Sequence, residues 1–472
     1  MKALSVASEI YPLVKTGGLA DVAGALPGAL ATEGVTVHSL VPGYPAVLDA
    51  LPSVEEAARF ADLFGGPARL LAGQAFGLNV LAIEAPHLYA RAGALYGHAD
   101  DAHRFAALGW VAAEIGRGAV AGFVPDVVHA HDWQAGLAPT YLHYGDGRRP
   151  GTVMTVHNLA FQGQFPAHLL GPLRLPAAAW AIEGVEYYGA IGFLKAGLLL
   201  ADRVTTVSPT YADEIRTDPG GMGLGGLLRA RGNALRGILN GIDTQVWDPA
   251  TDANLAARYD ASGLQSRAAN KTALQAQLGL EPDPEALLVG VVTRLTWQKG
   301  ADLLAEALPG LFAAGGQVAL LGSGEPALEM AFAAAAATHT GRVGVRIGYD
   351  EELAHLIQGG ADVIAVPSRF EPCGLTQLCA LRYGALPLVA RVGGLADTVI
   401  DANEMALAAG VATGLQFAPV TREALEVALG RAMRLWGDQA AWRQVQRNAM
   451  AADVGWTRPA KHYAEVYRAA VG

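Results

Sequence analysis

A glutamate in the second half of the chain stands in a tight loop directly after an apolar run. The run 362–367 (DVIAVP) is typical of a buried parallel strand, so Glu371 is expected just beyond its carboxyl end. Open α/β sheets bind ligands at this edge. Pro372 and Gly374 favour a tight turn, and the apolar stretch 378–381 indicates a helix after it. A carboxylate here can bind hydroxyl groups while helix amides receive an anion. The alternative is a solvated Glu371 beside an ordinary capping turn.

A second loop, near the N-terminus, places a lysine beside two glycines. Gly17 and Gly18 let the backbone approach an oxyanion closely, and the ammonium group of Lys15 supplies positive charge. An ordinary tight loop with a surface lysine is the alternative. The sequence GGLAD at 17–21 recurs at 393–397, each time after a candidate strand and before a helix-like stretch. Two related sheets that face one another would bring both Gly-Gly loops to one cleft.

Two cations share the loop 293–300 (TRLTWQKG), which follows the first strand predicted in the second half. A guanidinium group at Arg294 and an ammonium group at Lys299 can together bind a diphosphate and stabilise the charge that grows on a phosphate leaving group. The chain contains no Asp-x-Asp motif that could hold a metal ion for this task. Solvated loop charges are the alternative, and we favour the diphosphate site.

Histidines and an aspartate follow two strands of the first half, in 128–133 (VHAHDW) and 156–159 (VHNL). Three convergent metal ligands at a recognisable spacing do not occur there. Recognition of a hydroxylated ligand, with Trp133 as a stacking surface, is the better functional interpretation. For His129 a core histidine bonded to the backbone remains an alternative. The glycine-rich stretch 221–226 matches dinucleotide-binding spacing, but it follows a helix-like segment rather than a strand, which predicts a loop.

Composition limits the classes of protein that this chain can represent. With 472 residues, 52% hydrophobic and 17% charged, two or three domains are expected. A formal charge of −10 argues against nucleic acid or an anionic membrane as the main partner. No run reaches the roughly 18 apolar residues of a membrane span. Glu9 interrupts the short apolar start, and only two cysteines occur, Cys373 and Cys379, so we expect a cytoplasmic protein.

Short β-type runs alternate with longer Ala- and Leu-rich stretches along the whole chain, which predicts parallel sheets with crossover helices. The strands expected in the first half are 3–7, 35–41, 78–83, 127–130, 153–156 and 204–207. Those expected in the second half are 288–293, 318–321, 343–347, 363–366 and 386–390. Between the halves, 240–249 (NGIDTQVWDP) is rich in turn residues, and we place the domain boundary there.

Six motifs together resemble the bacterial glycogen synthase family, and plant starch synthases share them. They are KTGGL at 15–19, HAHDW at 129–133, TVHNL at 155–159, NGID at 240–243, RLTWQKG at 294–300 and EPCGL at 371–375. The resemblance extends in order to GWT at 455–457 and covers nearly the whole chain. It implies an α/β protein of GT-B architecture, with two Rossmann-like doubly wound domains facing a central cleft. The implied reaction transfers glucose from ADP-glucose to the nonreducing end of an α-1,4-glucan, with retention at the anomeric carbon.

The same resemblance implies a domain plan. Residues 1–240 form the N-terminal domain on the acceptor side, 241–250 a hinge, and 251–456 the C-terminal domain that binds the nucleotide sugar. Residues 457–472 form a closing helix that crosses back to the N-terminal domain. Arg391 departs from the family pattern, since a small residue or a lysine is expected two positions before the second Gly-Gly pair.

Site residues follow from the resemblance position by position. The catalytic set is His157, Arg294, Lys299 and Glu371. The donor and nucleotide set is Lys15, Gly17, Gly18, Tyr349, Cys373, Gly374, Leu375 and Thr376, with Tyr349 against adenine. The glucose and acceptor set is Asp21, Asp132, Trp133, Asn158 and Asn240. The implied partners are ADP-glucose and an α-1,4-glucan such as glycogen or a maltooligosaccharide, without metal, cofactor, nucleic acid or membrane; the oligomeric state stays open.

Two rival functions follow from the same residues. The diphosphate and sugar motifs do not specify the base, so a retaining GT-B transferase that uses UDP-glucose or another acceptor is the nearer rival. A glucan-binding protein without catalysis is the other. Intact Lys15, Arg294, Lys299 and Glu371 argue against it, because a binding protein needs no diphosphate site.

Overall fold

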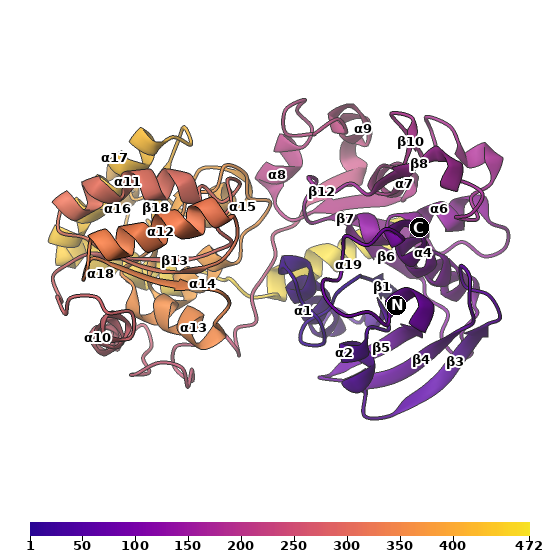
Figure 1. Ribbon diagram of the computed structural model, residues 1–472, viewed down its shortest axis with the longest axis horizontal. Helices are drawn as coiled ribbons and strands as arrows, with labels where there is room; N and C mark the ends of the chain where they lie inside the picture. Colours follow the sequence, from indigo (N-terminus) through magenta and orange to yellow (C-terminus); the bar gives the residue numbers. More distant parts are fainter. The chain divides into compact units, whose positions relative to one another are not determined.

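The computed structural model describes residues 1–472, which form two units, each built on a sheet with helices on both faces (Figure 1). The first unit comprises residues 1–240 and 456–472, and the second comprises 241–455. The chain therefore passes between the units twice, at 240–241 and at 455–456. All eleven strands expected from the sequence are present, and their ends differ from the expected ones by at most two residues.

The first sheet has nine strands in the order β12-β11-β7-β6-β1-β2-β5-β4-β3. The strands are β1 (Lys2–Val6), β2 (Thr36–Pro42), β3 (Val54–Phe60), β4 (Ala68–Ala75), β5 (Leu78–Glu84), β6 (Val127–His131), β7 (Gly151–Val156), β11 (Arg203–Thr206) and β12 (Leu235–Gly237). All neighbours pair in parallel except β3, β4 and β5, which form an antiparallel meander at one edge. The sequence predicts parallel sheets with crossover helices, and this edge is an antiparallel addition to them. Its outer strand, β3, is largely exposed and charged and lacks the apolar run of a buried strand.

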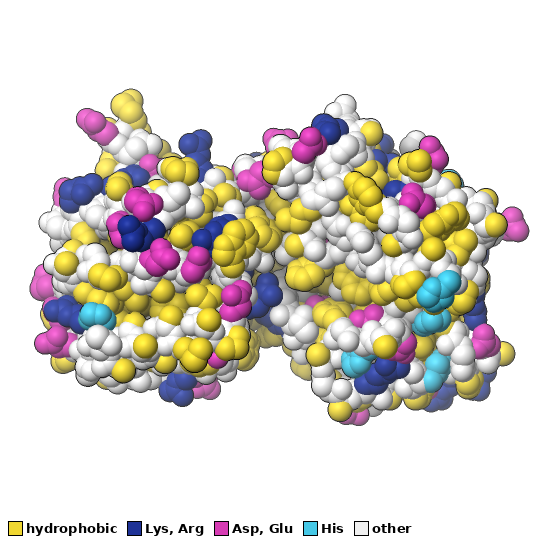
Figure 2. Space-filling model, turned by 45° about the horizontal axis from the view of Figure 1, so that its top comes forward, with side chains coloured by type: hydrophobic (Ala, Val, Ile, Leu, Met, Phe, Trp, Pro, Cys, Tyr) yellow, Lys and Arg dark blue, Asp and Glu magenta, His cyan; other side chains and the backbone are white.

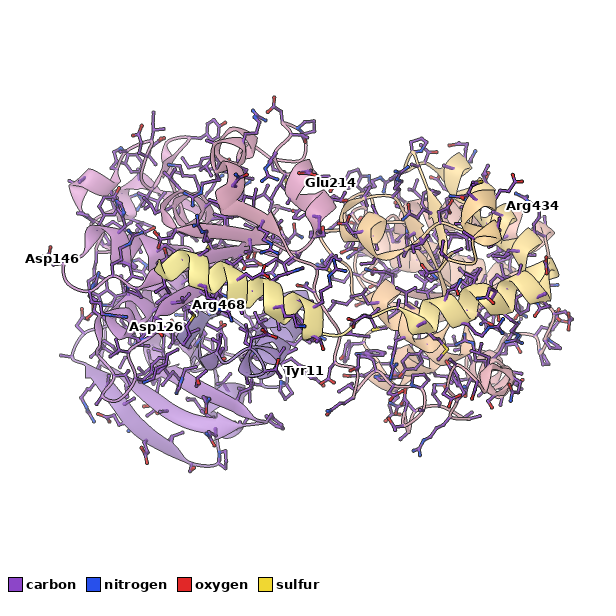
Figure 3. All side chains as sticks on the ribbon, turned by 180° about the vertical axis from the view of Figure 1, so that it is seen from behind. Tyr11, Asp126, Asp146, Glu214, Arg434 and Arg468 are labelled. Atoms are coloured by element: carbon purple, nitrogen blue, oxygen red, sulfur yellow. The ribbon has the colours of Figure 1, made fainter.

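Helices cover both faces of the first sheet. One face carries α1 (Gly18–Ala31) and the last helix, α19 (Thr457–Val471), which returns to this unit and lies along it in Figure 3. Both helices share a core with strands β1, β6 and β7, and Tyr463 and Tyr467 of α19 are fully buried in it. The other face carries α4 (Asp101–Arg117), α5 (Asp132–Ala135), α6 (Leu137–Tyr144) and α7 (Phe193–Leu200).

The second sheet has six parallel strands in the order β15-β14-β13-β16-β17-β18. They are β13 (Leu288–Val292), β14 (Gln317–Gly322), β15 (Val343–Ile347), β16 (Val363–Val366), β17 (Leu386–Ala390) and β18 (Leu415–Phe417). Alternate residues enter opposite cores: Val318 and Leu320 pack on one face, and Ala319 and Leu321 pack on the other. This two-sided burial explains why these strands appear in the sequence as continuous apolar runs.

The helices of the second unit divide between these two cores. One core includes α11 (Ala301–Ala313), α17 (Arg422–Gly437) and α18 (Gln439–Ala451), together with Phe332 of α12 (Pro326–Thr338). The other includes α10 (Arg267–Gln277) and α13 (Glu351–Gly360). Helix α14 (Thr376–Tyr383) contributes to both, and α15 (Gly393–Thr398) and α16 (Glu404–Ala408) follow β17.

The remaining elements are short. They are α2 (Pro45–Asp49), α3 (Pro86–Tyr89), α8 (Pro209–Glu214), α9 (Gly225–Ala230), a three-stranded sheet of β8 (Gln164–Pro166), β9 (Glu186–Tyr187) and β10 (Ala190–Gly192), and the 3-10 turns 167–169, 177–179, 232–234 and 264–266. The glycine-rich stretch 221–226 runs from the turn after α8 into the first two residues of α9, so its end is helical rather than loop. It follows no strand, which confirms the rejection of a dinucleotide fingerprint.

The surface and the helix lengths bear on possible partners. Acidic and basic side chains are interspersed on the visible face of each unit (Figure 2). No helix combines the length and apolar character that crossing a bilayer requires.

The order of the strands shows where each sheet can bind a ligand. In the first sheet the chain runs outward from β1 on one side and from β6 on the other, so the order reverses between these two neighbours. In the second sheet the reversal lies between β13 and β16. Open α/β sheets bind ligands beyond the carboxyl ends of the strands at such a reversal. The loops that follow β1, β6, β13 and β16 contain most of the residues singled out in the sequence.

Candidate active site

The loops after β13 and β16 are fastened to one another at the reversal of the second sheet. The backbone N–H of Arg369 donates to the carbonyl of Gln298 at 2.8 Å, and its guanidinium forms two 2.7 Å hydrogen bonds with Asp302. The same guanidinium lies 4.5 Å from the ring centre of Trp297. Gly300 has φ +66, and a Cβ there would lie 2.0 Å from the carbonyl oxygen of Pro367. The two loops therefore form one rigid support.

Lys299 and Glu371, one from each loop, form an ion pair on this support. The ammonium nitrogen of Lys299 lies 2.5 Å from Oε2 of Glu371, and the hydroxyl of Ser368 donates to the same oxygen at 3.0 Å. Glu371 is only 6% exposed. The other carboxylate oxygen, Oε1, accepts no hydrogen bond. One oxygen thus anchors the side chain, and the second is available to a ligand.

Arg294 differs from Lys299 in its surroundings. Its side chain is exposed and forms no hydrogen bond or ion pair within the protein. It stands two residues beyond β13, on the loop that carries Lys299. The loop therefore presents one unpaired guanidinium and one ammonium group already bound to a carboxylate.

Tyr349 stands at the same edge of the sheet, beyond the end of β15. Its side chain is 78% exposed, and its hydroxyl donates to Glu351 at 2.6 Å. An exposed aromatic ring can stack against a planar base. The exposed ring of Tyr349 is compatible with the stacking against adenine that the resemblance implies.

The chain after Glu371 turns sharply into α14. Gly374 has φ +75, and the side-chain amide of Gln377 donates to the carbonyls of Cys373 at 3.0 Å and Gly374 at 2.9 Å. Helix α14 begins at Thr376, as the sequence indicated, and Leu375 at its N-cap provides no side-chain hydrogen bond. The first-turn amides of a helix without a side-chain cap can bind an anion.

The second Gly-Gly pair packs directly against the Glu371 loop. Gly393 has φ +42, and a Cβ there would lie 2.0 Å from the carbonyl oxygen of Glu371. The N–H of Gly394 points to the carbonyls of Glu371 and Pro372, at 3.1 and 3.2 Å. The exposed Arg391 precedes the pair and donates its backbone N–H to Phe417. In this unit the glycines allow a close backbone approach that fixes the Glu371 loop.

In the first unit, the loop after β1 wraps around a buried carboxylate, that of Glu9. Oxygen Oε2 of Glu9 accepts the backbone N–H groups of Thr16 and Gly17, and Oε1 accepts the hydroxyls of Thr16 at 2.7 Å and Tyr96 at 2.6 Å. Glu9 is 3% exposed. The glycine pair predicts a backbone that approaches an oxyanion of the ligand, but the N–H of Gly17 already binds Glu9. Gly18 begins α1, so its N–H has no partner within the helix.

Lys15 and Asp21 form an ion pair on the same loop and helix. Their charged atoms are 2.7 Å apart, and both side chains are partly exposed. Lys15 also lies 5.3 Å from the ring centre of Tyr11. The predicted donor residue Lys15 and the predicted glucose residue Asp21 are therefore neighbours in space.

Asp132 holds the backbone of the loop after β7. It is one of few residues other than glycine with positive φ, +55, and its Oδ1 accepts the N–H of His157 at 2.7 Å. Burial raises the pKa of the Asp132 carboxyl to about 7, and hydrogen bonds from the N–H groups of His157 and Asn158 act in the opposite direction. Burial also lowers the pKa of His157 to about 3, so this imidazole is neutral at physiological pH.

The other predicted sugar residues have different surroundings. Trp133 belongs to an aromatic cluster, with ring centres 4.9 Å from Phe105 and 5.7 Å from Phe165. The side-chain oxygen of Asn158 accepts the N–H of Ala160 at 3.0 Å. The buried side-chain oxygen of Asn240 has no hydrogen-bond partner. A buried amide oxygen without a partner is costly unless a ligand or water satisfies it, so Asn240 is the best supported of the three.

Sequence reasoning missed three residues that shape the site. Glu9 was considered only as an interruption of an apolar run, although a carboxylate at the end of a buried strand requires partners and the glycine-rich loop follows closely. Ser368 directly follows the predicted strand, but a single serine there has no pattern that predicts its hydrogen bond to Glu371. Tyr96 lies in a loop between α3 and α4, far along the chain from Glu9, and no local pattern marks it.

Comparison with known families agrees with this division into two units. Residues 2–230 match the family described as the starch synthase catalytic domain, and residues 271–449 match group 1 of the glycosyl transferases. A glycogen synthase from Rhodopseudomonas palustris is 61% identical, over 99% of this chain and 96% of that protein. One from Acidiphilium cryptum is 61% identical over 99% of both chains, and one from Methylocella silvestris is 59% identical over 98% of both.

Two solved structures match this chain over nearly its whole length. The catalytic domain of starch synthase IV from Arabidopsis thaliana, bound to ADP and acarbose, superposes with a TM-score of 0.89 at 33% identity, over 100% of this chain and 99% of that one. Sucrose-phosphate synthase from Thermosynechococcus elongatus superposes with a TM-score of 0.59 at 20% identity, over 99% and 98% of the two chains, which is a likeness of fold alone.

Proposed function

The chain belongs to the family of glycogen and starch synthases, and from this premise we propose that it transfers glucose from ADP-glucose to the nonreducing end of an α-1,4-glucan with retention of configuration. It is a glycosyltransferase of GT-B fold that makes glycogen by glucosyl transfer. The proposed parts are the ADP-linked donor, the site of attachment and the stereochemistry. A starch synthase of the same fold bound to ADP and acarbose supports the first two.

One observation carries the assignment of the donor site. At the reversal of the second sheet, an exposed and unpaired Arg294 shares a loop with Lys299, and Lys299 binds the buried Glu371. The planar guanidinium group suits the oxygens of a diphosphate. An ammonium group has three donors, so Lys299 can bind Glu371 with one and the diphosphate with the others. The same lysine would then connect the leaving group to the residue that binds the sugar.

The proposed chemistry is a displacement on one face of the glucose ring. The acceptor hydroxyl oxygen bonds to C1 while the bond from C1 to the diphosphate oxygen breaks. The electron pair leaves with the diphosphate, and the acceptor's proton moves to a phosphate oxygen. Arg294 and Lys299 stabilise the charge that grows on the departing diphosphate. We propose that no metal ion or other cofactor takes part, because these two cations supply the positive charge that a divalent ion provides elsewhere.

Glu371 is proposed to bind donor hydroxyls rather than to attack C1. A retaining glycosidase that uses a nucleophilic carboxylate has a second carboxyl group about 5 to 5.5 Å away. The contacts of the Glu371 carboxylate are instead Lys299 and Ser368. An anchored carboxylate with one available oxygen can orient the ring and stabilise charge near the anomeric carbon.

We also propose a cytoplasmic location, supported by the absence of a disulfide between the two cysteines, since a reducing compartment keeps thiols reduced.

The reaction is tested by nucleotide release. Purified enzyme with ADP-glucose and glycogen should release ADP, and release should fall to background without glycogen. Faster turnover of UDP-glucose would assign the chain to the rival transferase activity. No glycogen-dependent release from either donor would leave a glucan-binding protein.

A further inference from the structure

His131 lies between two polar groups in the interior of the first unit. Its Nδ1 is 3.0 Å from Nε2 of His157, and its Nε2 is 3.1 Å from the hydroxyl oxygen of Ser5. The side chain has no solvent exposure. Both ring nitrogens are therefore committed to hydrogen bonds, and one of these bonds is to His157, which the family resemblance assigns to the catalytic set.

This contact restricts the protonation of His157. A neutral imidazole has one N–H donor and one acceptor nitrogen, so in the pair one ring donates and the other accepts. Burial lowers the pKa of both rings, which keeps both neutral. If the hydroxyl of Ser5 donates to His131, then Nδ1–H of His131 donates to His157, and the remaining proton of His157 is on Nδ1. If Nε2–H of His131 instead donates to Ser5, then Nε2–H of His157 donates to Nδ1 of His131, and Nδ1 of His157 carries no proton. In both orders Nε2 of His157 is used within the protein, which leaves Nδ1 and the backbone carbonyl for a ligand.

The neighbouring residue fixes the backbone of the same histidine. Asp132 follows His131 at the end of β6 and accepts the backbone N–H of His157 at 2.7 Å. Strands β6 and β7 pair in parallel, with His131 opposite Thr155, so the loop carrying His157 begins beside this strand end. Two consecutive residues of one strand end therefore hold the ring and the main chain of His157.

We propose that His131 is a positioning residue for glucosyl transfer, which fixes the ring plane and tautomer of His157. This inference rests on the proposed function, because it matters for catalysis only if His157 borders the reacting glucose. Residues that orient a metal-bound histidine typically change metal affinity or activity 10- to 100-fold when they are removed, and we expect a similar scale for a histidine oriented beside a sugar. Small displacements of a positioned group lower the reaction rate, because the reaction requires a defined geometry.

His129 offers a matched control two residues earlier on the same strand. It is also fully buried, and it also uses both ring nitrogens, with Tyr467 at 2.7 Å and Thr155 at 2.5 Å. Its partners belong to α19 and β7 and do not include His157. The ring of His129 also packs against that of His131, with ring centres 4.0 Å apart, but it forms no hydrogen bond with His131 or His157. Replacement of His129 should therefore weaken the attachment of α19 and leave the hydrogen bonds that orient His157 in place.

The test replaces histidine by asparagine or glutamine in the full-length enzyme, because each side-chain amide can take the place of one ring nitrogen. The side-chain amide of asparagine reaches the position of Nδ1, and that of glutamine reaches the position of Nε2. His131→Gln should keep the contact with Ser5, lose the contact with His157 and lower kcat roughly 10- to 100-fold, with KM for ADP-glucose nearly unchanged. His131→Asn should keep the contact with His157 and retain most of kcat. His129→Gln should lower the thermal unfolding temperature and leave kcat near the wild-type value.

Three results would overturn the inference in an active wild-type enzyme. In the first, His131→Gln and His129→Gln have the same kcat. In the second, His131→Gln changes KM and leaves kcat unchanged. In the third, His131→Asn lowers kcat as much as His131→Gln does. Circular dichroism and melting of each variant separate loss of folding from loss of kcat. A wild-type enzyme that transfers no glucose would contradict the proposed function itself, before any variant is compared.

Discussion

Lys299 and Arg294 share a loop and a proposed role, yet their surroundings differ enough to separate their effects. Lys299 binds Glu371 at 2.5 Å, whereas Arg294 is exposed and unpaired. Removal of Lys299 leaves the carboxylate of Glu371, which is 6% exposed, with only Ser368 as a partner. Removal of Arg294 leaves no buried charge behind. Removal of Lys299 should therefore lower both the stability of the fold and the rate of the reaction, whereas removal of Arg294 should lower the rate alone.

We predict that Arg294→Ala and Lys299→Ala each lower kcat roughly 10²- to 10³-fold, the scale for loss of one preorganised donor to a transition state. Lys299→Ala should also lower the free energy of unfolding by about 2 kcal/mol, because a hydrogen bond to a charged group is lost. Arg294→Ala should leave it unchanged. Because both cations act on one leaving group, the double variant should lose less than the product of the two single losses. Steady-state kinetics measure kcat, and chemical denaturation measures the free energy of unfolding. If either single variant raised KM and left kcat unchanged, the proposed role of that residue would be contradicted.

Glu371→Gln separates the shape of this residue from its charge. Glutamine can still bind sugar hydroxyls, so we predict a slower enzyme that retains measurable activity and makes the same α-linked product. Glu55→Gln, on the exposed edge strand β3 of the first unit, provides a control outside every loop that is proposed to bind substrate. Detection by intact-protein mass spectrometry of a glucosyl ester on Glu371, in wild-type enzyme quenched during turnover, would make this residue a nucleophile and refute the proposed binding role.

At the scale of elements, the ends of strands could be predicted from the sequence and the contacts between loops could not. The runs at 288–292 and 363–366 are apolar because both faces of the second sheet are buried, and this burial is visible in the composition. Strand β3 carries charge and lies at an edge, so its residues do not alternate clearly. The partners of Glu9 and Lys299 depend on which strands are neighbours, and that order is not a local property of the sequence.

The loop after β1 offers a test of the arrangement that only the structure revealed. Glu9 accepts four hydrogen bonds from Thr16, Gly17 and Tyr96. Glu9→Ala removes all four acceptors, so the loop with Lys15 should lose its fixed shape and KM for ADP-glucose should rise roughly 10-fold. Glu9→Gln can accept both backbone N–H groups and donate to the two hydroxyls, so it should stay within a few-fold of wild type. If Glu9→Gln is as impaired as Glu9→Ala, the negative charge is required and the hydrogen-bond account is wrong.

The buried His129 of strand β6 should make the stability of the first unit depend on pH. Burial lowers the pKa of His129 to about 3, whereas an exposed histidine titrates near 6.5. Its contribution to stability is therefore complete above pH 6.5 and is lost as the pH falls toward 3. At pH 5 the loss is about 2 kcal/mol for this residue. Wild-type enzyme should lose more thermal stability between pH 7.5 and 5 than His129→Gln, which cannot titrate. Equal losses in the two proteins would contradict the buried neutral state.

At the scale of the whole molecule, the two units divide the proposed work. The first contains the candidate sugar groups around His157 and Asp132, and the second contains the candidate diphosphate and base groups around Arg294 and Tyr349. The Gly-Gly-Leu-Ala-Asp repeat has different local tasks in the two units. Gly17 caps α1 and binds Glu9, whereas Gly393 and Gly394 support the Glu371 loop. The sequence indicated related sheets but not this difference, because the repeated residues are identical and their neighbours are not.

The central claim is glucosyl transfer from ADP-glucose to a glucan end with retention and without a metal ion. NMR of dialysed enzyme in EDTA, given ADP-glucose labelled with ¹³C at C1 of glucose and a maltooligosaccharide, tests all of it in one sample. We predict that the donor signal disappears as ADP forms, while one new signal grows at the position of an α-1,4-linked nonreducing glucose. A β-linked product, release of free glucose in place of a longer glucan, or activity only after magnesium is added would contradict this account.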